Sequence, residues 1–241
     1  QKNIPFGSVM SKVWNQKIFK HIQEKADQAS VKLAEERGSC PDAEEYGIKE
    51  RFSNKTAIAP TASISVICGG ASPGIEPIAA NSYTHKTLSG SFNVRNKYLA
   101  KILEKHGKND DETWSSITTN QGSVSHLDFL TDIEKDTFKT AFEIDQRWIV
   151  ELGADRTPNI SQAQSINVFV PADIHKRDLH QIHFQAWKKG LKSLYYCRSK
   201  SIQRAENVNT GSSTDVTKNV YKANKESTNE ENKYEECLSC Q

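Results

Sequence analysis

The chain has 241 residues, and its 32 Lys and Arg against 30 Asp and Glu leave a formal net charge of +2 at pH 7. A charge this close to zero provides no general attraction to nucleic acids or to anionic membranes. No apolar run approaches the roughly 20 residues of a membrane-spanning helix. We therefore expect no nucleic-acid or membrane partner, and one large domain or two small ones.

Polar residues are distributed unevenly along the chain. Residues 199–241 are nearly all Lys, Glu, Asn, Ser and Thr, a composition that buries too little apolar surface to offset the entropy of ordering. We predict a folded domain over residues 1–198 and a disordered tail over 199–241. Because the N-terminus lacks a signal pattern and the five cysteines form no disulfide framework, we expect a cytoplasmic protein.

The first half of the chain contains two clear helical patterns. Apolar residues recur every three or four positions from Met10 to Arg37, and Gly38 follows as an end signal. Asn96–His106 shows the same period and is closed by Gly107. Between them, residues 56–68 are small and β-branched, interrupted by Pro60, and a loop rich in Gly and Pro follows.

The second half predicts a strand–helix–strand unit. Residues 110–119 form a polar connection or a short helix, and residues 128–152 form two helices or one broken helix. A strand from Ser165 ends before Pro171, a helix covers Asp178–Gly190, and a second strand covers Leu191–Arg198. This order is typical of a βαβ unit, so the predicted fold class is α/β.

Cys237 and Cys240 form a Cys-x-x-Cys pair next to the C-terminus. This spacing is typical of a redox dithiol or of half a zinc site, and two stray thiols are the alternative. Structural zinc needs four ligands, and Cys40, Cys68 and Cys197 are single residues that we expect in the core. A flexible tether with a reach of roughly 30–35 Å would let a dithiol collect electrons and deliver them by disulfide exchange. We interpret the pair as a redox shuttle.

Two further features are weaker by themselves. Pro60–Ser65 (Pro-Thr-Ala-Ser-Ile-Ser) offers hydroxyls and N–H groups to a phosphate, although a buried strand of small residues is the favoured alternative. Tyr195 and Tyr196 should pack on opposite faces of a strand, and pointing the same way would require irregular backbone. The histidines lack a metal-binding pattern, so we predict no metal site.

These features, in this order, resemble the C-terminal part of the large, catalytic subunit of class I ribonucleotide reductase, in its viral and eukaryotic forms. The resemblance begins near Met10. The matching segments are Leu33–Cys40, Ile58–Ser65, Gly74–Pro77, Thr87–Gly90, Gln164–Val168, Trp187–Lys192, Tyr195–Tyr196 and Glu236–Cys240.

The resemblance implies the later part of a ten-stranded α/β barrel. It also implies a role in the radical reduction of ribonucleoside diphosphates, which supplies deoxyribonucleotides for DNA replication. Tyr195 and Tyr196 would belong to the radical path, and Cys237 and Cys240 would re-reduce the active-site disulfide. The substrate's diphosphate would be bound by Pro60, Thr61, Ala62, Ser63 and Ile64.

The resemblance implies three protein partners. These are the small subunit with its di-iron centre and tyrosyl radical, thioredoxin or glutaredoxin as reductant, and the N-terminal portion of the large subunit. That portion carries the radical cysteine and the oxidised cysteine pair, which have no counterpart here. No cofactor is expected in this chain itself. We expect a C-terminal piece, either a fragment or a split-gene product, that is inactive alone and exposes apolar surface.

Two other functional hypotheses remain open. The chain could be a non-catalytic domain derived from this fold that binds a nucleotide or the small subunit. A thioredoxin-like oxidoreductase is disfavoured, because its cysteine pair would begin a helix after a strand. A binding domain has no use for both the tyrosine pair and the terminal dithiol, so the enzyme component is the preferred prediction.

Overall fold

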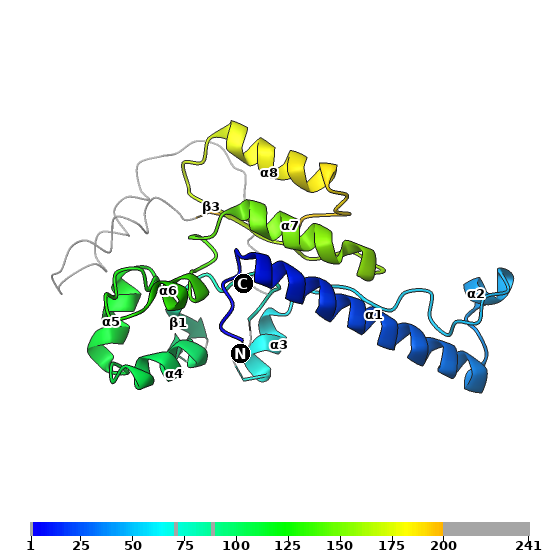
Figure 1. The fold of residues 1–241 in the computed structure, drawn as a ribbon, viewed down its shortest axis with the longest axis horizontal. Helices are drawn as coiled ribbons and strands as arrows, with labels where there is room; N and C mark the ends of the chain where they lie inside the picture. Colours follow the sequence, from blue (N-terminus) through cyan, green and yellow to red (C-terminus); the bar gives the residue numbers. More distant parts are fainter. Residues whose placement is uncertain (1, 70–71, 88–89, 200–241) are drawn as a thin grey trace, which may run out of the picture. The chain divides into compact units, whose positions relative to one another are not determined.

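A long helix, α1 (Val9–Arg37), dominates the N-terminal part of the computed structural model, which describes residues 2–69, 72–87 and 90–199 (Figure 1). The hydroxyl of Ser8 accepts the Ser11 N–H at 3.2 Å and begins the helix. Gly38 ends it with φ 81°, and its N–H donates to the Ala34 carbonyl at 2.9 Å. Both ends of the predicted helix are therefore confirmed.

Helix α1 leaves several of its large apolar residues exposed. Among its residues only Ser30 and Ala34 are buried, while Ile18 and Ile22 are 48% and 43% exposed. Among the helices, it packs mainly against α7 (Gln146–Arg156) and the short 3-10 helix η1 (Thr157–Asn159).

Two short helices and a hairpin follow. Helix α2 covers Pro41–Glu45, and α3 covers Ala62–Ile67. Strands β1 (Ser82–Thr87) and β2 (Gly90–Arg95) are antiparallel. The favoured prediction of a buried strand in residues 56–68 is wrong. Pro60 has no N–H for a strand ladder, and only Ile58 forms an isolated bridge, with Gln164.

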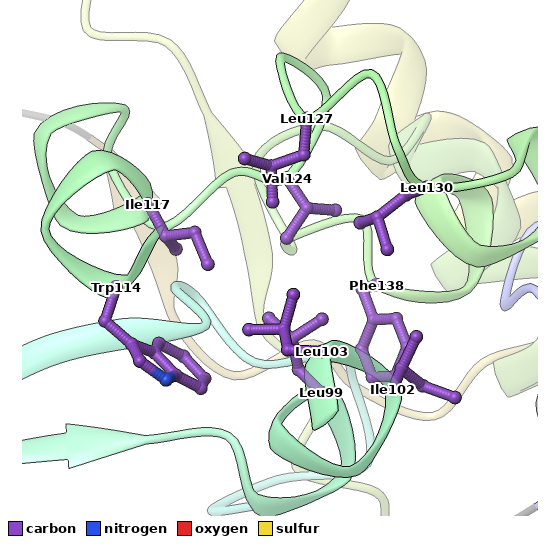
Figure 2. Packing of buried hydrophobic residues seen from close by; sticks show 9 residues of the cluster. All are labelled: Leu99, Ile102, Leu103, Trp114, Ile117, Val124, Leu127, Leu130 and Phe138. Atoms are coloured by element: carbon purple, nitrogen blue, oxygen red, sulfur yellow. The ribbon is translucent and has the colours of Figure 1, made fainter. Parts of the chain in front are cut away.

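Helices α4 (Lys97–Lys105), α5 (Asp111–Thr119) and α6 (Asp132–Thr137) come next in the chain. Each begins at a residue whose side-chain oxygen accepts a backbone N–H of the first turn, namely Asn96, Asp110 and Thr131. A buried cluster, to which α4 and α5 contribute, is shown in Figure 2. It consists of Leu99, Ile102, Leu103, Trp114, Ile117, Val124, Leu127, Leu130 and Phe138.

The predicted strand–helix–strand unit is present in the C-terminal part. Strand β3 (Val168–Val170) is parallel to β4 (Cys197–Ser199), and α8 (Lys176–Lys188) connects them. Helix α7 contacts both α1 and α8 (Figure 1). The predicted α/β class is therefore confirmed. Strand β4 begins later than predicted, since residues 191–196 are irregular.

The strands of the described residues form two separate two-stranded sheets, which do not close a barrel. None of the helices in this part of the chain combines the length and the apolar character needed to cross a membrane. Residues 200–241, with most of the predicted tail, lie outside the described residues.

Candidate functional site

The predicted phosphate loop, Pro60–Ser65, is fixed at its N-terminal end. The Ile58 N–H, just before the loop, donates to the Ala163 carbonyl at 3.2 Å. The N–H and the hydroxyl of Thr61 both donate to the Pro73 carbonyl, at 3.1 and 3.0 Å. Thr61 therefore ties the loop to the following Pro73 turn, and both of its donors are engaged there.

Helix α3 begins immediately after Thr61. The Ser65 N–H donates to the Thr61 carbonyl at 2.8 Å, which is the first hydrogen bond of the helix. The N–H groups of Ala62, Ser63 and Ile64 precede this bond and have no acceptor within the helix. Ser63 and Ile64 are exposed. Three backbone N–H groups and one serine hydroxyl are thus available here to hydrogen-bond an anion.

The remaining serine of the loop has a structural contact. Ser65 is buried, and its hydroxyl donates to the Ala62 carbonyl at 2.7 Å. Pro60 has no N–H to donate. Of the five predicted substrate-binding residues, Ala62, Ser63 and Ile64 have the geometry for direct contact, while Pro60 and Thr61 shape the loop.

Tyr195 and Tyr196 lie in irregular backbone just before β4. Their ring centroids are 4.1 Å apart, and their hydroxyl oxygens lie 3.4 Å apart. The Tyr195 N–H donates to the Ile166 carbonyl at 2.7 Å, and the Tyr196 carbonyl accepts the Val168 N–H at 2.9 Å. The two residues are 42% and 39% exposed. The two phenols therefore form one continuous pair that solvent or a partner can reach.

A buried carboxylate lies beyond the Pro73 turn. Glu76 is only 5% exposed. Its Oε1 accepts the backbone N–H of Asn167 at 2.5 Å, and its Oε2 accepts the side-chain Nδ2–H at 3.3 Å. These two bonds join the segment that follows the phosphate loop to the residue just before β3.

Arg156 provides positive charge in the same region. It is buried, its Nε donates to Gln164 Oε1 at 2.6 Å, and its guanidinium also reaches Asn15 Oδ1. Burial lowers the pKa of Arg156 to about 10, although the carboxylates of Glu76 and Asp155 raise it. Arg156 therefore stays charged at neutral pH and compensates part of the buried negative charge of Glu76.

The cysteines are arranged differently from the prediction. Cys68 and Cys197 are exposed and Cys40 is half-buried, so their predicted place in the core is wrong. Cys68 lies just beyond α3 and Cys197 in an edge strand, where neighbouring chain does not cover them. Cys237 and Cys240 lie outside the described residues.

A family model described as the ribonucleotide reductase barrel domain matches residues 42–197. The chain belongs to the ribonucleotide reductase barrel-domain family. This match contains the phosphate loop, Glu76, Asn167 and the tyrosine pair. It confirms the resemblance that the sequence motifs indicated, and it assigns the described elements within residues 42–197 to part of that barrel.

Named relatives and one solved structure agree with the ribonucleotide reductase match. The ribonucleoside-diphosphate reductase large subunit of Invertebrate iridescent virus 6 is 47% identical over 214 residues, which cover 87% of this chain and 22% of the relative. The Caenorhabditis elegans large subunit is 31% identical over 271 residues, covering 98% and 33%. The Actinobacillus ureae class Id ribonucleotide reductase alpha subunit has a TM-score of 0.75 and 40% identity, covering 83% and 36%.

The chain thus spans about a fifth to a third of the length of these relatives. Among the described residues, no group of three or more His, Cys, Asp or Glu side chains is arranged to hold a metal ion. Within those residues, the candidate site consists of the phosphate loop, the Glu76–Asn167 pair and the tyrosine pair.

The sequence motifs indicate no individual role for Glu76 or Asn167. Both lie in segments that carry the family resemblance, Gly74–Pro77 and Gln164–Val168. The signal available in the sequence was an acidic residue between Ile75 and Pro77, in a loop otherwise made of small and apolar residues. Such a residue is buried only when it is hydrogen-bonded or paired.

Proposed function

We propose that this chain is a component of a ribonucleoside-diphosphate reductase. In this role it binds the diphosphate of the substrate, supplies the last tyrosines of a radical path, and returns electrons through its terminal dithiol. The observation that carries the proposal is the pair of phenol hydroxyls 3.4 Å apart, in a chain that belongs to the ribonucleotide reductase family.

The proposed reaction is a two-electron reduction. The 2′-hydroxyl of a ribonucleoside diphosphate leaves as water, and a dithiol that becomes a disulfide provides the two electrons and the two protons. Cys237 and Cys240 would then reduce that disulfide by thiol–disulfide exchange and would themselves be reduced by thioredoxin or glutaredoxin. The nucleotide gains the two electrons that the first dithiol loses, and in each later exchange one disulfide forms where another is broken.

The phosphate loop supports the substrate assignment. The N–H groups of Ala62, Ser63 and Ile64 and the exposed hydroxyl of Ser63 are hydrogen-bond donors, and a diphosphate presents only acceptors. Thr61 holds the loop in place through the Pro73 carbonyl. A preformed loop loses little conformational entropy when it binds the substrate.

The tyrosine pair supports the radical assignment. A phenol can give up its proton and an electron together, whereas a phenylalanine ring has no O–H to lose. Two hydroxyl oxygens 3.4 Å apart allow the proton and the electron to be transferred between Tyr195 and Tyr196 over a short distance. Because both rings are partly exposed, a small subunit that carries a di-iron centre and a tyrosyl radical could deliver the oxidising equivalent there.

The remaining catalytic groups would come from another polypeptide segment. The radical-bearing cysteine and the cysteine pair oxidised during turnover have no counterpart in this chain. We therefore propose the upstream portion of the large subunit as an obligatory partner, and we expect this chain to be inactive without it. The exposed apolar residues of α1, including Ile18 and Ile22, are suited to contact with that portion.

A reconstitution experiment tests the proposal. Reduction of labelled CDP is measured with this chain alone, with the di-iron small subunit added, and with both that subunit and a polypeptide carrying the upstream part of the barrel. We expect deoxycytidine diphosphate only in the complete mixture. No product in any mixture, from well-folded proteins, would favour the second candidate, a non-catalytic nucleotide- or small-subunit-binding domain of this fold.

A further inference from the structure

A chain of hydrogen bonds leads from the phosphate loop to Glu76. Thr61 donates twice to the Pro73 carbonyl, and Gly74 directly follows Pro73. Two residues later, the buried carboxylate of Glu76 accepts both the backbone N–H and the side-chain N–H of Asn167. Glu76, and through it the loop, is thus joined to Asn167, which lies 91 positions further along the sequence.

The same strand segment holds the tyrosine pair. The residue before Asn167, Ile166, accepts the Tyr195 N–H, and the residue after it, Val168, donates to the Tyr196 carbonyl. Asn167 is therefore located between the two backbone contacts that fix Tyr195 and Tyr196. A displacement of Asn167 would move both contacts.

The surroundings of Glu76 are built for a carboxylate. A Cβ atom on Gly74 would overlap Glu76 Oε2, so only glycine leaves the carboxylate its place. Burying a carboxylate is costly unless it is hydrogen-bonded or compensated by charge. The two bonds from Asn167 and the nearby positive charge of Arg156 provide that compensation.

We propose that Glu76 is a positioning residue that holds the phosphate loop and the tyrosine pair in one fixed relative geometry, through Asn167. The inference rests on the proposed functions of those two elements. Glu76 touches neither the substrate nor the reacting atoms in this account. Its effect is to make the position of Tyr195 and Tyr196 depend on the conformation of the loop that binds the diphosphate.

The proposal predicts that one substitution at Glu76 changes two measurements, one that reports on the phosphate loop and one that reports on Tyr195. The variants are Glu76→Ala, which removes both hydrogen bonds, and Glu76→Gln, which keeps one acceptor and nearly the same volume. Glu45→Ala, an exposed carboxylate in α2, is the matched control. All are prepared in the complete assembly of large and small subunits, with 3-fluorotyrosine at position 195 for the spectroscopic measurement.

The first readout is the KM for CDP, which reports on the phosphate loop. The second is the ¹⁹F chemical shift at position 195, recorded with and without CDP. Loss of a buried, charge-assisted hydrogen bond corresponds to roughly a tenfold change in an equilibrium constant. We expect Glu76→Ala to raise the KM by roughly that factor, to shift the ¹⁹F signal without CDP, and to abolish its response to CDP.

Glu76→Gln should change both readouts in the same direction by a smaller amount, and Glu45→Ala should change neither. If the alanine variant does not fold, the glutamine variant decides by the same criterion. A higher KM with an unchanged ¹⁹F signal, or the reverse, would overturn the proposed coupling. An unsubstituted assembly that fails to reduce CDP would instead overturn the proposed function itself, so the two failures are distinguishable.

Discussion

The hydroxyl oxygens of Tyr195 and Tyr196 lie 3.4 Å apart, although adjacent residues of a regular strand point to opposite faces. The backbone is irregular at both residues and becomes strand only at Cys197. Hydrogen bonds to Ile166 and Val168 hold this irregular stretch against the start of β3. The fold therefore fixes the position of the pair, and the two phenols are adjacent to each other at this surface.

The phosphate loop predicts a specific loss of substrate affinity. Ser63 offers an exposed hydroxyl beside the N–H groups of Ala62 and Ile64. We expect Ser63→Ala to raise the KM for CDP roughly tenfold in the complete assembly, because one hydrogen bond to a charged phosphate is lost. Ser53→Ala, at another exposed serine, should leave the KM unchanged. Equal KM values for the two variants would contradict the assigned contact.

The terminal dithiol predicts a dependence on the size of the reductant. The double variant Cys237→Ser with Cys240→Ser should lose turnover driven by thioredoxin or glutaredoxin, which cannot enter the barrel. It should retain turnover driven by dithiothreitol, which is small enough to reach a buried disulfide directly. Cys40→Ser serves as the thiol control. If both reductants fail equally with the double variant, the shuttle assignment is wrong.

The environment of His126 predicts that the free energy of unfolding decreases in mild acid. Its Nε2 lies 2.8 Å from the Ser116 hydroxyl oxygen, while its Nδ1 is buried without a hydrogen-bond partner among the described residues. Burial, together with the charge of Lys135, lowers the pKa of His126 below 6.5, and Asp128 only partly opposes this. As the pH falls, His126 therefore takes up a proton in the unfolded state before it does so in the folded state. The free energy of unfolding is thus at its full value above about pH 6.5 and decreases below it.

The measurement is urea unfolding at about pH 7.5 and about pH 5.5. The free energy of unfolding should decrease between these values, and His126→Gln should show a smaller decrease because it cannot take up the proton. His21→Gln, at an exposed histidine of α1, should behave like the unsubstituted chain. A His126→Gln variant with the full pH dependence would show that this residue is not its source.

The exposed face of α1 predicts an effect on assembly without an effect on folding. Ile18 and Ile22 are one turn apart and largely exposed. Ile22→Lys should change the free energy of unfolding of this chain by less than about 0.5 kcal/mol. It should weaken association with the upstream polypeptide in sedimentation experiments. Gln16→Lys adds the same charge at an exposed polar site of the helix and should leave this association unchanged. Unchanged association of Ile22→Lys would remove α1 from the proposed interface.

The parts of the fold that the sequence predicts are those marked by local signals at the ends of helices. Helix α1 ends at Gly38, and α4 begins at Asn96, whose side chain satisfies the first N–H groups. Such signals depend on residues within one turn of each other. The hairpin of β1 and β2 was missed because polar residues occupy most of its positions, as in Ser82–Thr87, and no apolar alternation marks it.

The candidate site was predictable only in part. The loop and the tyrosines lie in short motifs, so their positions could be read from the sequence. The pairing of Glu76 with Asn167 joins residues 91 positions apart, and no local pattern encodes such a contact. The direction of the tyrosine side chains also depends on a long-range contact, the hydrogen bonds to Ile166 and Val168.

The most direct test of the account is Tyr196→Phe in the complete assembly, with Tyr83→Phe as the control. Tyr83 has a similar exposed fraction, 45% against 39%, but lies in the hairpin. CDP binding by equilibrium dialysis and CDP reduction with either thioredoxin or dithiothreitol are measured on both variants. We predict that Tyr196→Phe binds CDP normally and loses turnover with both reductants, while Tyr83→Phe retains both properties. Normal CDP reduction by Tyr196→Phe would contradict the radical-path assignment on which the proposed function rests.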